Sequence, residues 1–385
     1  MTANSTPKSG EIIVHVFGKT DVGRTREHNE DSFVVADLNT MNATLQPEVR
    51  THAPGALGSL FMVADGMGGA AAGEIASAMA TEVVLQELES RWRAASSHDS
   101  ETFARAIKGA AETANARIHR YASEHPENRG MGTTATIAGL LGDTLYLAQV
   151  GDSRAYLVRN GVAQQITKDQ SLMQKLVEAG ELTAEEAEVS ERRNIILQAL
   201  GPEPVVKVDL THQQVRRDDV LVLCSDGLSG QIRTSDIARI VEEQPDLVNV
   251  CKELIDLANA NGGPDNITVI AVRFDGSGLN VASAGEDVGH TAYTGLADSR
   301  TTIPVDLGAI QALDDEASGN GPLRTEQAAA SPRRAPGAPN SAASPMKPAT
   351  RTPIPGGRVP KNVLRMIFGA IALLIALYSY FKLRG

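Results

Sequence analysis

The 385-residue sequence is poor in cysteine and has no surplus of positive charge. Its two cysteines, Cys224 and Cys251, form no CxxC pattern, which argues against a disulfide framework and against a structural zinc site. Cys224 lies in an apolar segment, so we expect it to be a buried core residue. The net charge of −11 argues against a general nucleic-acid-binding protein, because phosphate backbones require a basic surface.

Three regions of the chain differ in composition. Residues 12–274 alternate apolar segments, glycine turns and amphipathic patterns, and they predict the folded domain. Residues 275–361 are rich in Ala, Pro, Gly, Ser, Thr and Arg, a composition that cannot bury a core and predicts a disordered linker. Residues 1–10 are polar and contain no apolar core, so we expect no secretory signal and a folded domain in the reducing cytoplasm.

Residues 363–381 form an apolar run close to the ~20 residues that span a bilayer as a helix. Aromatic residues near its end fit the interfacial belt of a single-pass transmembrane helix. The linker carries more positive charge than the residues after the run, so the positive-inside rule places the folded domain on the cytoplasmic side of the membrane. A buried or interfacial helix is the alternative, but the linker offers it nothing to pack against.

Periodicity predicts strands at 12–17, 32–36, 59–64, 133–140, 144–150, 155–158, 205–210, 220–224 and 267–274. It predicts helices at 74–94, 102–121, 235–243 and 247–260. Turn signals at Gly142 and at Asn160-Gly161 predict hairpins, which favour antiparallel sheets. The predicted fold class is α+β, a four-layer α-β-β-α sandwich of two antiparallel sheets flanked by helices.

Four short segments are each centred on an aspartate: Asp31, Asp65, Asp226 and Asp265. At least three of them adjoin apolar runs typical of strands. A carboxylate at the end of a buried strand is costly to desolvate unless it meets a cation. Ligands that are all oxygen suit hard divalent ions such as magnesium or manganese. The sequence therefore indicates a metal-dependent hydrolase, although a lone Asp before Gly is most often a turn residue.

Longer motifs carry a resemblance. The segment DVGRTREHNED at 21–31 resembles the opening motif of the metal-dependent protein phosphatase family, type 2C, and VADGMGG at 63–69 resembles its second motif. The segments GTT at 132–134, GDSR at 151–154, SDG at 225–227 and DN at 265–266 follow in the family's order. DQS at 169–171 matches the bacterial branch of eukaryotic-like serine/threonine phosphatases. The resemblance covers residues 12–274.

The resemblance implies two metal ions, Mn or Mg, and a role for each matching residue. Asp65 would bridge both ions, and the Gly66 carbonyl would be a second ligand. Asp226 and Asp265 would complete one shell, Glu30 would bind the other ion, and Asp31 would orient metal-bound water from further out. A water held between two cations loses a proton easily and would attack phosphorus directly.

Arg26 matches the phosphate-binding arginine of the family, and its planar fork fits two phosphate oxygens. Arg24 is its nearest competitor, but the spacing to Asp31 favours Arg26. Asp152 and Arg154 allow two interpretations, a structural ion pair or a part in catalysis.

Two positions depart from the family pattern. Met67 stands where eukaryotic members carry a histidine that is proposed to protonate the leaving group, and methionine cannot donate a proton. Arg129 stands where bacterial members often carry an aspartate for a third metal. A cation there predicts two strongly bound ions and a weak or absent third.

The predicted function is metal-dependent hydrolysis of phosphoserine and phosphothreonine in proteins beside a membrane. The expected partners are phosphorylated proteins, among them serine/threonine kinases and their substrates. Residues 169–194 resemble the flap that borders the cleft, and a capping box at Thr183 predicts a helix within it. Two alternatives stay open: a pseudophosphatase that binds phosphoproteins without turnover, and a metal-dependent nuclease or polynucleotide phosphatase, which the acidic charge disfavours.

Overall fold

The computed structural model describes residues 10–43, 50–68, 72–188, 190 and 192–296. The predicted linker beyond residue 296 and the predicted transmembrane segment 363–381 lie outside these residues. Within the described ranges, no helix combines the length and the hydrophobicity that crossing a bilayer requires.

Two antiparallel sheets form the centre of the domain. The first has the order β3 (Arg50–His52), β1 (Ile13–Asp21), β12 (Ile267–Asp275), β11 (Val220–Cys224), β8 (Arg154–Arg159) and β9 (Val162–Gln165). The second has the order β10 (Asp209–Gln214), β7 (Thr144–Val150), β6 (Ala135–Leu141), β4 (Ser59–Met67) and β2 (Asp31–Asp37), and the short β5 (Gly132–Thr133) pairs with β4. The predicted pair of antiparallel sheets is confirmed.

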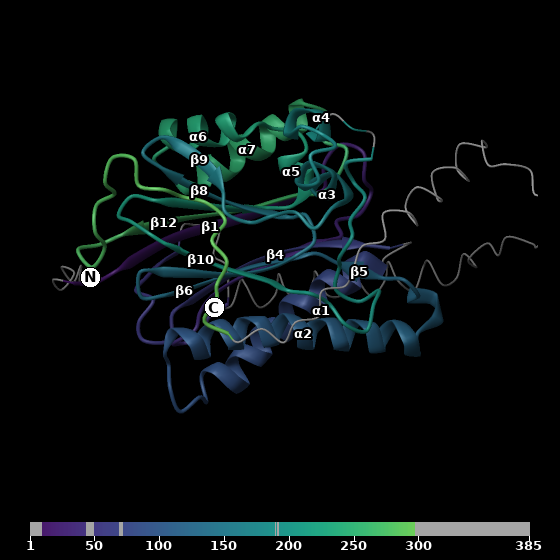
Figure 1. The fold of residues 1–385 in the computed structure, drawn as a ribbon, viewed down its shortest axis with the longest axis horizontal. Helices are drawn as coiled ribbons and strands as arrows, with labels where there is room; N and C mark the ends of the chain where they lie inside the picture. Colours follow the sequence, from purple (N-terminus) through teal and green to yellow (C-terminus); the bar gives the residue numbers. More distant parts are fainter. Residues whose placement is uncertain (1–9, 44–49, 69–71, 189, 191, 297–385) are drawn as a thin grey trace, which may run out of the picture. The chain divides into compact units, whose positions relative to one another are not determined.

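Helices cover the outer faces of both sheets, as Figure 1 shows. Helices α1 (Ala72–Glu87) and α2 (Ser100–Glu124) pack on the second sheet, and α6 (Thr234–Glu243) and α7 (Leu247–Ala260) pack on the first. Shorter helices are α3 (Leu172–Glu178), α4 (Ala184–Glu188) and α5 (Asp226–Ser229), with a π-helical turn at Leu88–Trp92 and a 3₁₀ turn at Pro126–Asn128. The order of layers is therefore helix, sheet, sheet, helix.

Three apolar clusters hold the layers together. One fills the space between the sheets and includes Val14, Phe61 and Leu223. The second lies between the second sheet and the pair α1 and α2, and the third lies under α6 and α7 and contains both cysteines. The expectation that Cys224 is a buried core residue is confirmed. Burial of apolar surface in these layers is the main stabilising contribution to the fold.

The hairpins follow the turn chemistry of the sequence. Asn160 and Gly161 join β8 to β9 with φ angles of 52° and 74°, the left-handed pair that a two-residue primed turn requires. Some predicted boundaries were wrong: the strand predicted at 12–17 runs to Asp21, and the one predicted at 133–140 is divided into β5 and β6. The strand predicted at 205–210 begins at Asp209, because Pro202 and Pro204 hold the preceding residues in a loop. The helix predicted at 74–94 changes to a π-helical turn at Leu88.

The folded part continues past Phe274, where the sequence placed the start of the linker. Residues 276–296 run along the domain, and Tyr293 and Leu296 pack against the apolar cluster under α1 and α2. The backbone N–H of Tyr293 donates to the Leu210 carbonyl at 2.9 Å, and the His212 N–H donates to the Thr291 carbonyl at 2.9 Å. This segment therefore extends the second sheet beyond β10.

Candidate active site

The predicted carboxylates come from strand ends that the two sheets bring together. Asp31 begins β2 and lies opposite Asp65 of β4 in the antiparallel register. Asp226 begins α5 directly after β11, and Asp265 precedes β12, the strand that pairs with β11. Residues separated by about two hundred positions in sequence thus meet at one end of the sandwich.

Close backbone approach fixes the residue type at Gly66. Its N–H donates to the Glu30 carbonyl at 3.1 Å. A Cβ atom at this position would lie 2.2 Å from the Gly73 carbonyl oxygen and 2.5 Å from that of Glu30. Glycine is therefore required for β4, the Glu30 segment and the start of α1 to meet here. The predicted metal ligands Glu30 and Gly66 are brought together.

Only one of the two oxygens of the Asp31 carboxylate accepts hydrogen bonds from residues that the structure describes. Its Oδ2 accepts hydrogen bonds from the hydroxyls of Ser225 at 2.8 Å and Thr268 at 2.7 Å. Its Oδ1 is buried and has no hydrogen-bond partner among the described residues. An unpartnered buried carboxylate oxygen is costly, so this atom is suited to a cation or to an ordered water.

Desolvation and mutual repulsion raise the pKa values of these carboxyl groups. Desolvation raises the pKa of Asp31 to about 7, with Asp226 and Asp265 adding to the shift against two hydroxyl hydrogen bonds that oppose it. Desolvation, followed by repulsion from Asp31 and Asp226, raises the pKa of Asp65 well above its usual value. Desolvation also raises the pKa of Asp226, and Asp265 adds to it. So much confined negative charge favours binding of a cation.

The side chains do not form a closed cage. Within the described part of the chain, no three His, Cys, Asp or Glu side chains make a ready-made metal-binding set. The fit to a hard divalent ion rests instead on the chemistry of the donors, which are carboxylate and carbonyl oxygens, and on the unpartnered Asp31 Oδ1. A divalent ion would reduce the repulsion among the carboxylates and would give Asp31 Oδ1 a partner.

Arg26, not Arg24, faces the carboxylates. Its Nη2 lies 2.8 Å from Asp265 Oδ2, and its side chain is 48% exposed, so it stands at the edge of the site where a ligand can reach it. Arg24 forms no ion pair within the described residues, and its backbone N–H donates to the Gly263 carbonyl at 2.7 Å. The preference for Arg26 agrees with this geometry.

Asp152 does not pair with Arg154. The Arg154 guanidinium instead forms a bidentate pair with Asp169, with Nη2 at 2.7 Å from Oδ2 and Nε at 3.1 Å from Oδ1. Asp152 is buried, its Oδ1 has no hydrogen-bond partner among the described residues, and desolvation, followed by repulsion from Asp226 and Asp169, raises its pKa to about 8. The ion-pair interpretation was wrong, and Asp152 belongs electrostatically to the carboxylate cluster.

The sequence analysis missed the residues that position the carboxylates. Ser225 and Thr268 bond to Asp31, the Thr134 hydroxyl accepts the Asp65 N–H at 3.0 Å, and the Asn266 side-chain oxygen accepts the Glu30 N–H at 2.8 Å. Ser225, Thr134 and Asn266 lie within motifs already quoted. Ser225 and Asn266 stand next to Asp226 and Asp265 in sequence, and this position could have identified them.

Comparison with known proteins agrees with this site. A family model described as Protein phosphatase 2C matches residues 49–267. The chain belongs to this family. The serine/threonine phosphatase stp of Listeria monocytogenes is 36% identical over 262 residues, which cover 68% of this chain and 96% of that protein. The serine/threonine protein phosphatase PstP of Mycobacterium tuberculosis is 34% identical over 260 residues, which cover 67% of this chain and 45% of that protein.

Solved structures show the same fold. The crystal structure of Mycobacterium tuberculosis PstP/Ppp has a TM-score of 0.58 at 33% identity and covers 69% of this chain and 100% of that one. The PstP catalytic domain in complex with two manganese ions has a TM-score of 0.56 at 33% identity, with coverage of 69% and 100%. The family predicted from the order of the motifs is confirmed, and the chain is a protein phosphatase.

The predicted flap of this type 2C phosphatase contains α3 and α4. The capping box is present, because the Glu186 N–H donates to the Thr183 hydroxyl at 3.2 Å and the Thr183 N–H donates to the Glu186 carboxylate at 2.8 Å. Both flap ends join at Gln170, whose N–H donates to the Gly151 carbonyl at 2.9 Å and whose carbonyl accepts the Leu197 N–H at 2.8 Å. The flap therefore starts and ends beside Asp152.

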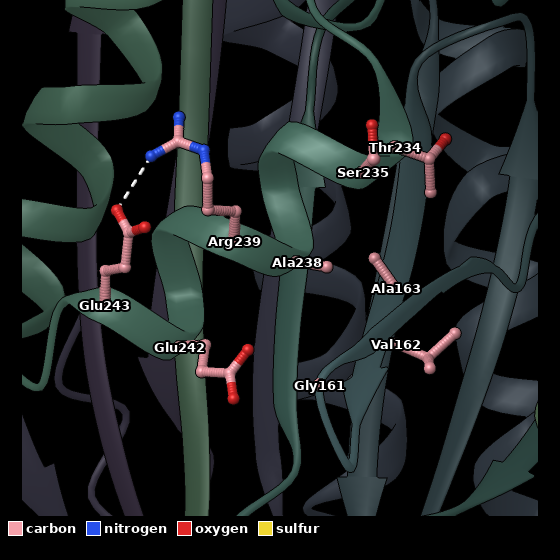
Figure 2. A pocket seen from close by; sticks show the side chains of 9 residues that line it. All are labelled: Gly161, Val162, Ala163, Thr234, Ser235, Ala238, Arg239, Glu242 and Glu243. Carbon is pink, nitrogen blue, oxygen red and sulfur yellow. Dashed lines mark hydrogen bonds and ion pairs between the residues drawn. The ribbon is translucent and has the colours of Figure 1, made fainter.

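A pocket of about 710 Å³ lies between the β8–β9 hairpin and α6 (Figure 2). Its wall includes Gly161, Val162 and Arg239, and Arg239 Nη1 pairs with Glu243 Oε2 at 2.7 Å. Strand β8 runs from the Asp152 end to this hairpin, and its six residues span about 20 Å. None of the predicted site residues lines this pocket.

Proposed function

We propose that this phosphatase hydrolyses phosphoserine and phosphothreonine in proteins with Mn²⁺ or Mg²⁺, two ions in each domain. The observation that carries the proposal is the meeting of Asp31, Asp65 and Asp226 beside the exposed Arg26. The listeria and mycobacterial relatives are named serine/threonine phosphatases, and the PstP catalytic domain binds two manganese ions in its solved structure. These findings support the same chemistry here.

Each residue takes the role that its position allows. Asp65 would bridge the ions, Asp226, Asp265 and Glu30 would complete their shells, and the Gly66 carbonyl would serve as a neutral ligand. Bound divalent ions supply a nucleophilic water that is deprotonated at neutral pH. Asp31, with Oδ2 fixed by two hydroxyls and Oδ1 unpartnered, would orient that water.

Arg26 would bind the phosphoryl group of the substrate. Its present partner is Asp265, and a phosphate offers the guanidinium two oxygens in place of one carboxylate contact. Asp265 would then be free of Arg26 and available as one of the residues that hold a metal ion. Met67 lies in β4 opposite Gly132 and carries no titratable group, so it cannot be the proton donor to the leaving oxygen.

The direct test is Mn²⁺-dependent release of phosphate from phosphothreonine peptides and of p-nitrophenol from p-nitrophenyl phosphate. Asp65→Asn and Asp226→Asn should abolish turnover, whereas Asp256→Asn, the same substitution on the exposed face of α7, should retain it. A wild-type protein that binds phosphopeptide but shows no turnover would instead establish the pseudophosphatase alternative.

We also propose that residues 363–381 anchor the protein in the cytoplasmic membrane, with the phosphatase domain in the cytoplasm and serine/threonine kinases and their substrates as partners. The apolar length, the aromatic residues and the basic linker of the sequence support this proposal. Carbonate extraction of membranes tests it, because the full chain should remain in the pellet and a chain ending at residue 361 should be released.

A further inference from the structure

A second pocket, of about 510 Å³, lies between the end of α2, the 3₁₀ turn at Pro126–Asn128 and the loop that follows the flap. Its lining includes His119, Ser123, Pro126, Arg129, Gly201 and Pro202. None of the residues that line it is acidic, and two carry basic groups. The pocket therefore has the character of an anion site, in contrast to the carboxylate cluster.

The wall of this pocket is held in place by hydrogen bonds to α2. The His119 Nδ1 donates to the Gly201 carbonyl at 2.8 Å, which leaves Nε2 free of that bond. The Gly201 N–H donates to the Asn115 side-chain oxygen at 2.8 Å, and the Asn115 amide donates to the Glu203 carbonyl at 3.1 Å. A loop fixed at three points does not have to be ordered when a ligand binds.

Arg129 is the unpaired cation of the pocket. It is exposed, its backbone N–H donates to the Pro126 carbonyl at 3.3 Å, and its side chain forms neither a hydrogen bond nor an ion pair with any residue in the described ranges. Glu124 and Glu127 are close in sequence but do not pair with it. An arginine without a partner keeps its full bidentate capacity for a carboxylate or a phosphate.

The pocket is connected directly to the catalytic end of the domain. Four residues beyond Arg129, Thr133 donates its hydroxyl to the Asp65 carbonyl at 2.9 Å and exchanges backbone hydrogen bonds with Leu200 at 2.8 and 3.0 Å. Four residues of chain span at most about 14 Å. An extended peptide whose phosphoryl group lies at the carboxylates could therefore place a side chain a few residues away at the Arg129 guanidinium.

We propose that this pocket binds an anionic side chain of the phosphoprotein substrate, a carboxylate or a second phosphate, a few residues from the phosphate that is hydrolysed. Arg129 supplies both the charge and the free donors, because the His119 Nδ1–H and the Ser123 hydroxyl already donate to the carbonyls of Gly201 and His119. The inference rests on the proposed function and adds a preference for acidic or doubly phosphorylated sequences. The same arginine stands where bacterial members of the family often carry an aspartate, and a positive charge there suits an anion.

The test uses phosphothreonine peptides that differ at one scanned position, carrying Gln, Glu or phosphoserine. For the full chain we expect kcat/KM to be about 3- to 10-fold higher for the best Glu or phosphoserine peptide than for its Gln counterpart, as for one charge-assisted hydrogen bond at an exposed site. In Arg129→Ala this ratio should fall to about one, and in Arg120→Ala, an exposed arginine outside the pocket, it should persist.

Two results would overturn the inference: a wild-type protein that does not discriminate at any scanned position, or a ratio that survives in Arg129→Ala. Turnover of p-nitrophenyl phosphate separates these results from a failure of the proposed function. A protein that hydrolyses this small substrate but ignores the anionic side chain is a phosphatase without the subsite. A protein that hydrolyses neither substrate is not the enzyme proposed.

Discussion

Asp31 lies directly opposite Asp65 in the paired strands β2 and β4, and neither forms an ion pair with a described residue. Like charges opposite one another in a sheet are destabilising. Here the repulsion is part of the site. A cation bound between the two carboxylates would remove the repulsion that destabilises the metal-free protein.

The first prediction concerns the stability of metal-free protein against pH. Asp31 and Asp152 have pKa values raised from 3.8 to about 7 and about 8, so the folded state binds more protons than the unfolded state above pH 4. Partial burial lowers the pKa values of His15 and His52 below 6.5, so these two groups oppose this effect only up to about that pH. Between pH 6.5 and 8 the free energy of unfolding should fall, by up to ~1.4 kcal/mol per pH unit for each carboxyl that stays protonated.

Urea unfolding in EDTA measures this slope, and Asp152→Asn should make it shallower. Added Mn²⁺ should stabilise the protein more at pH 8 than at pH 6.5, because metal binding requires deprotonated ligands. Stability that rises with pH in EDTA over this window would contradict the prediction.

The second prediction concerns Asp31. Asp31→Asn should weaken Mn²⁺ binding or kcat by about 10- to 100-fold, the usual cost of losing a group that orients a metal site. Thr268→Val removes one of the two hydroxyls on Oδ2 and should act in the same direction with a smaller effect. Titration calorimetry with Mn²⁺ measures the binding directly, and normal affinity in both variants would rule out this role.

The third prediction separates the two neighbouring arginines. Arg26→Ala should lower kcat/KM for p-nitrophenyl phosphate by about 10- to 100-fold, as expected for loss of a charge-assisted hydrogen bond to phosphate. Arg26→Lys should lie between, because an ammonium cannot bind two oxygens in a fork. Arg24→Ala is the control. An equal loss of kcat/KM in that variant would contradict the assignment of phosphate binding to Arg26 alone.

The fourth prediction concerns the ion pair of Arg159 and Asp219, whose side chains are 3% and 1% exposed and whose atoms approach to 2.7 Å. Asp219→Ala removes the close partner of this buried guanidinium, which keeps only Glu286 at 3.7 Å and the Gln214 carbonyl among the described residues, and it should lower the free energy of unfolding by ~3 kcal/mol. Glu243→Ala breaks an exposed pair with Arg239 and should have no measurable effect. Urea denaturation of both variants checks this contrast.

The fifth prediction concerns the end of the domain. A chain that ends after Asp275 should have a lower melting temperature than one that ends after Leu296. The shorter chain loses the packing of Tyr293 and Leu296 and the Glu286 carboxylate that pairs with Arg216 at 2.5 Å. Calorimetry of the two chains makes the comparison, and equal melting temperatures would place the end of the cooperative unit near Phe274.

The sequence predicted the layers and the catalytic aspartates because both have strong local signals. Strands such as Val220–Cys224 are continuous apolar runs, and a charge placed directly after one of them, as at Asp226, stands out. Hydroxyls and amides give no such signal. Ser225 and Thr268 matter because the fold places them on Asp31, which is 194 and 237 residues away in sequence, and periodicity cannot show such a relationship.

The end of the domain was harder to predict for a related reason. Residues 276–296 have little apolar periodicity, and they are ordered by edge pairing and by contacts of Glu286 with residues far back in the chain. The role of Asp152 stayed open because Arg154 is two residues away in sequence, whereas Asp169, the actual partner of Arg154, follows only after a hairpin. Tertiary contacts decided both cases.

Pairing of residues 291–293 with β10 has one further consequence. Strand β10 would otherwise present a row of free N–H and C=O groups on the outer side of the second sheet, a template on which another molecule could add a strand. By occupying that template, the segment protects the phosphatase against self-association through open sheet edges, and a chain cut before it would be expected to aggregate as well as to unfold more readily.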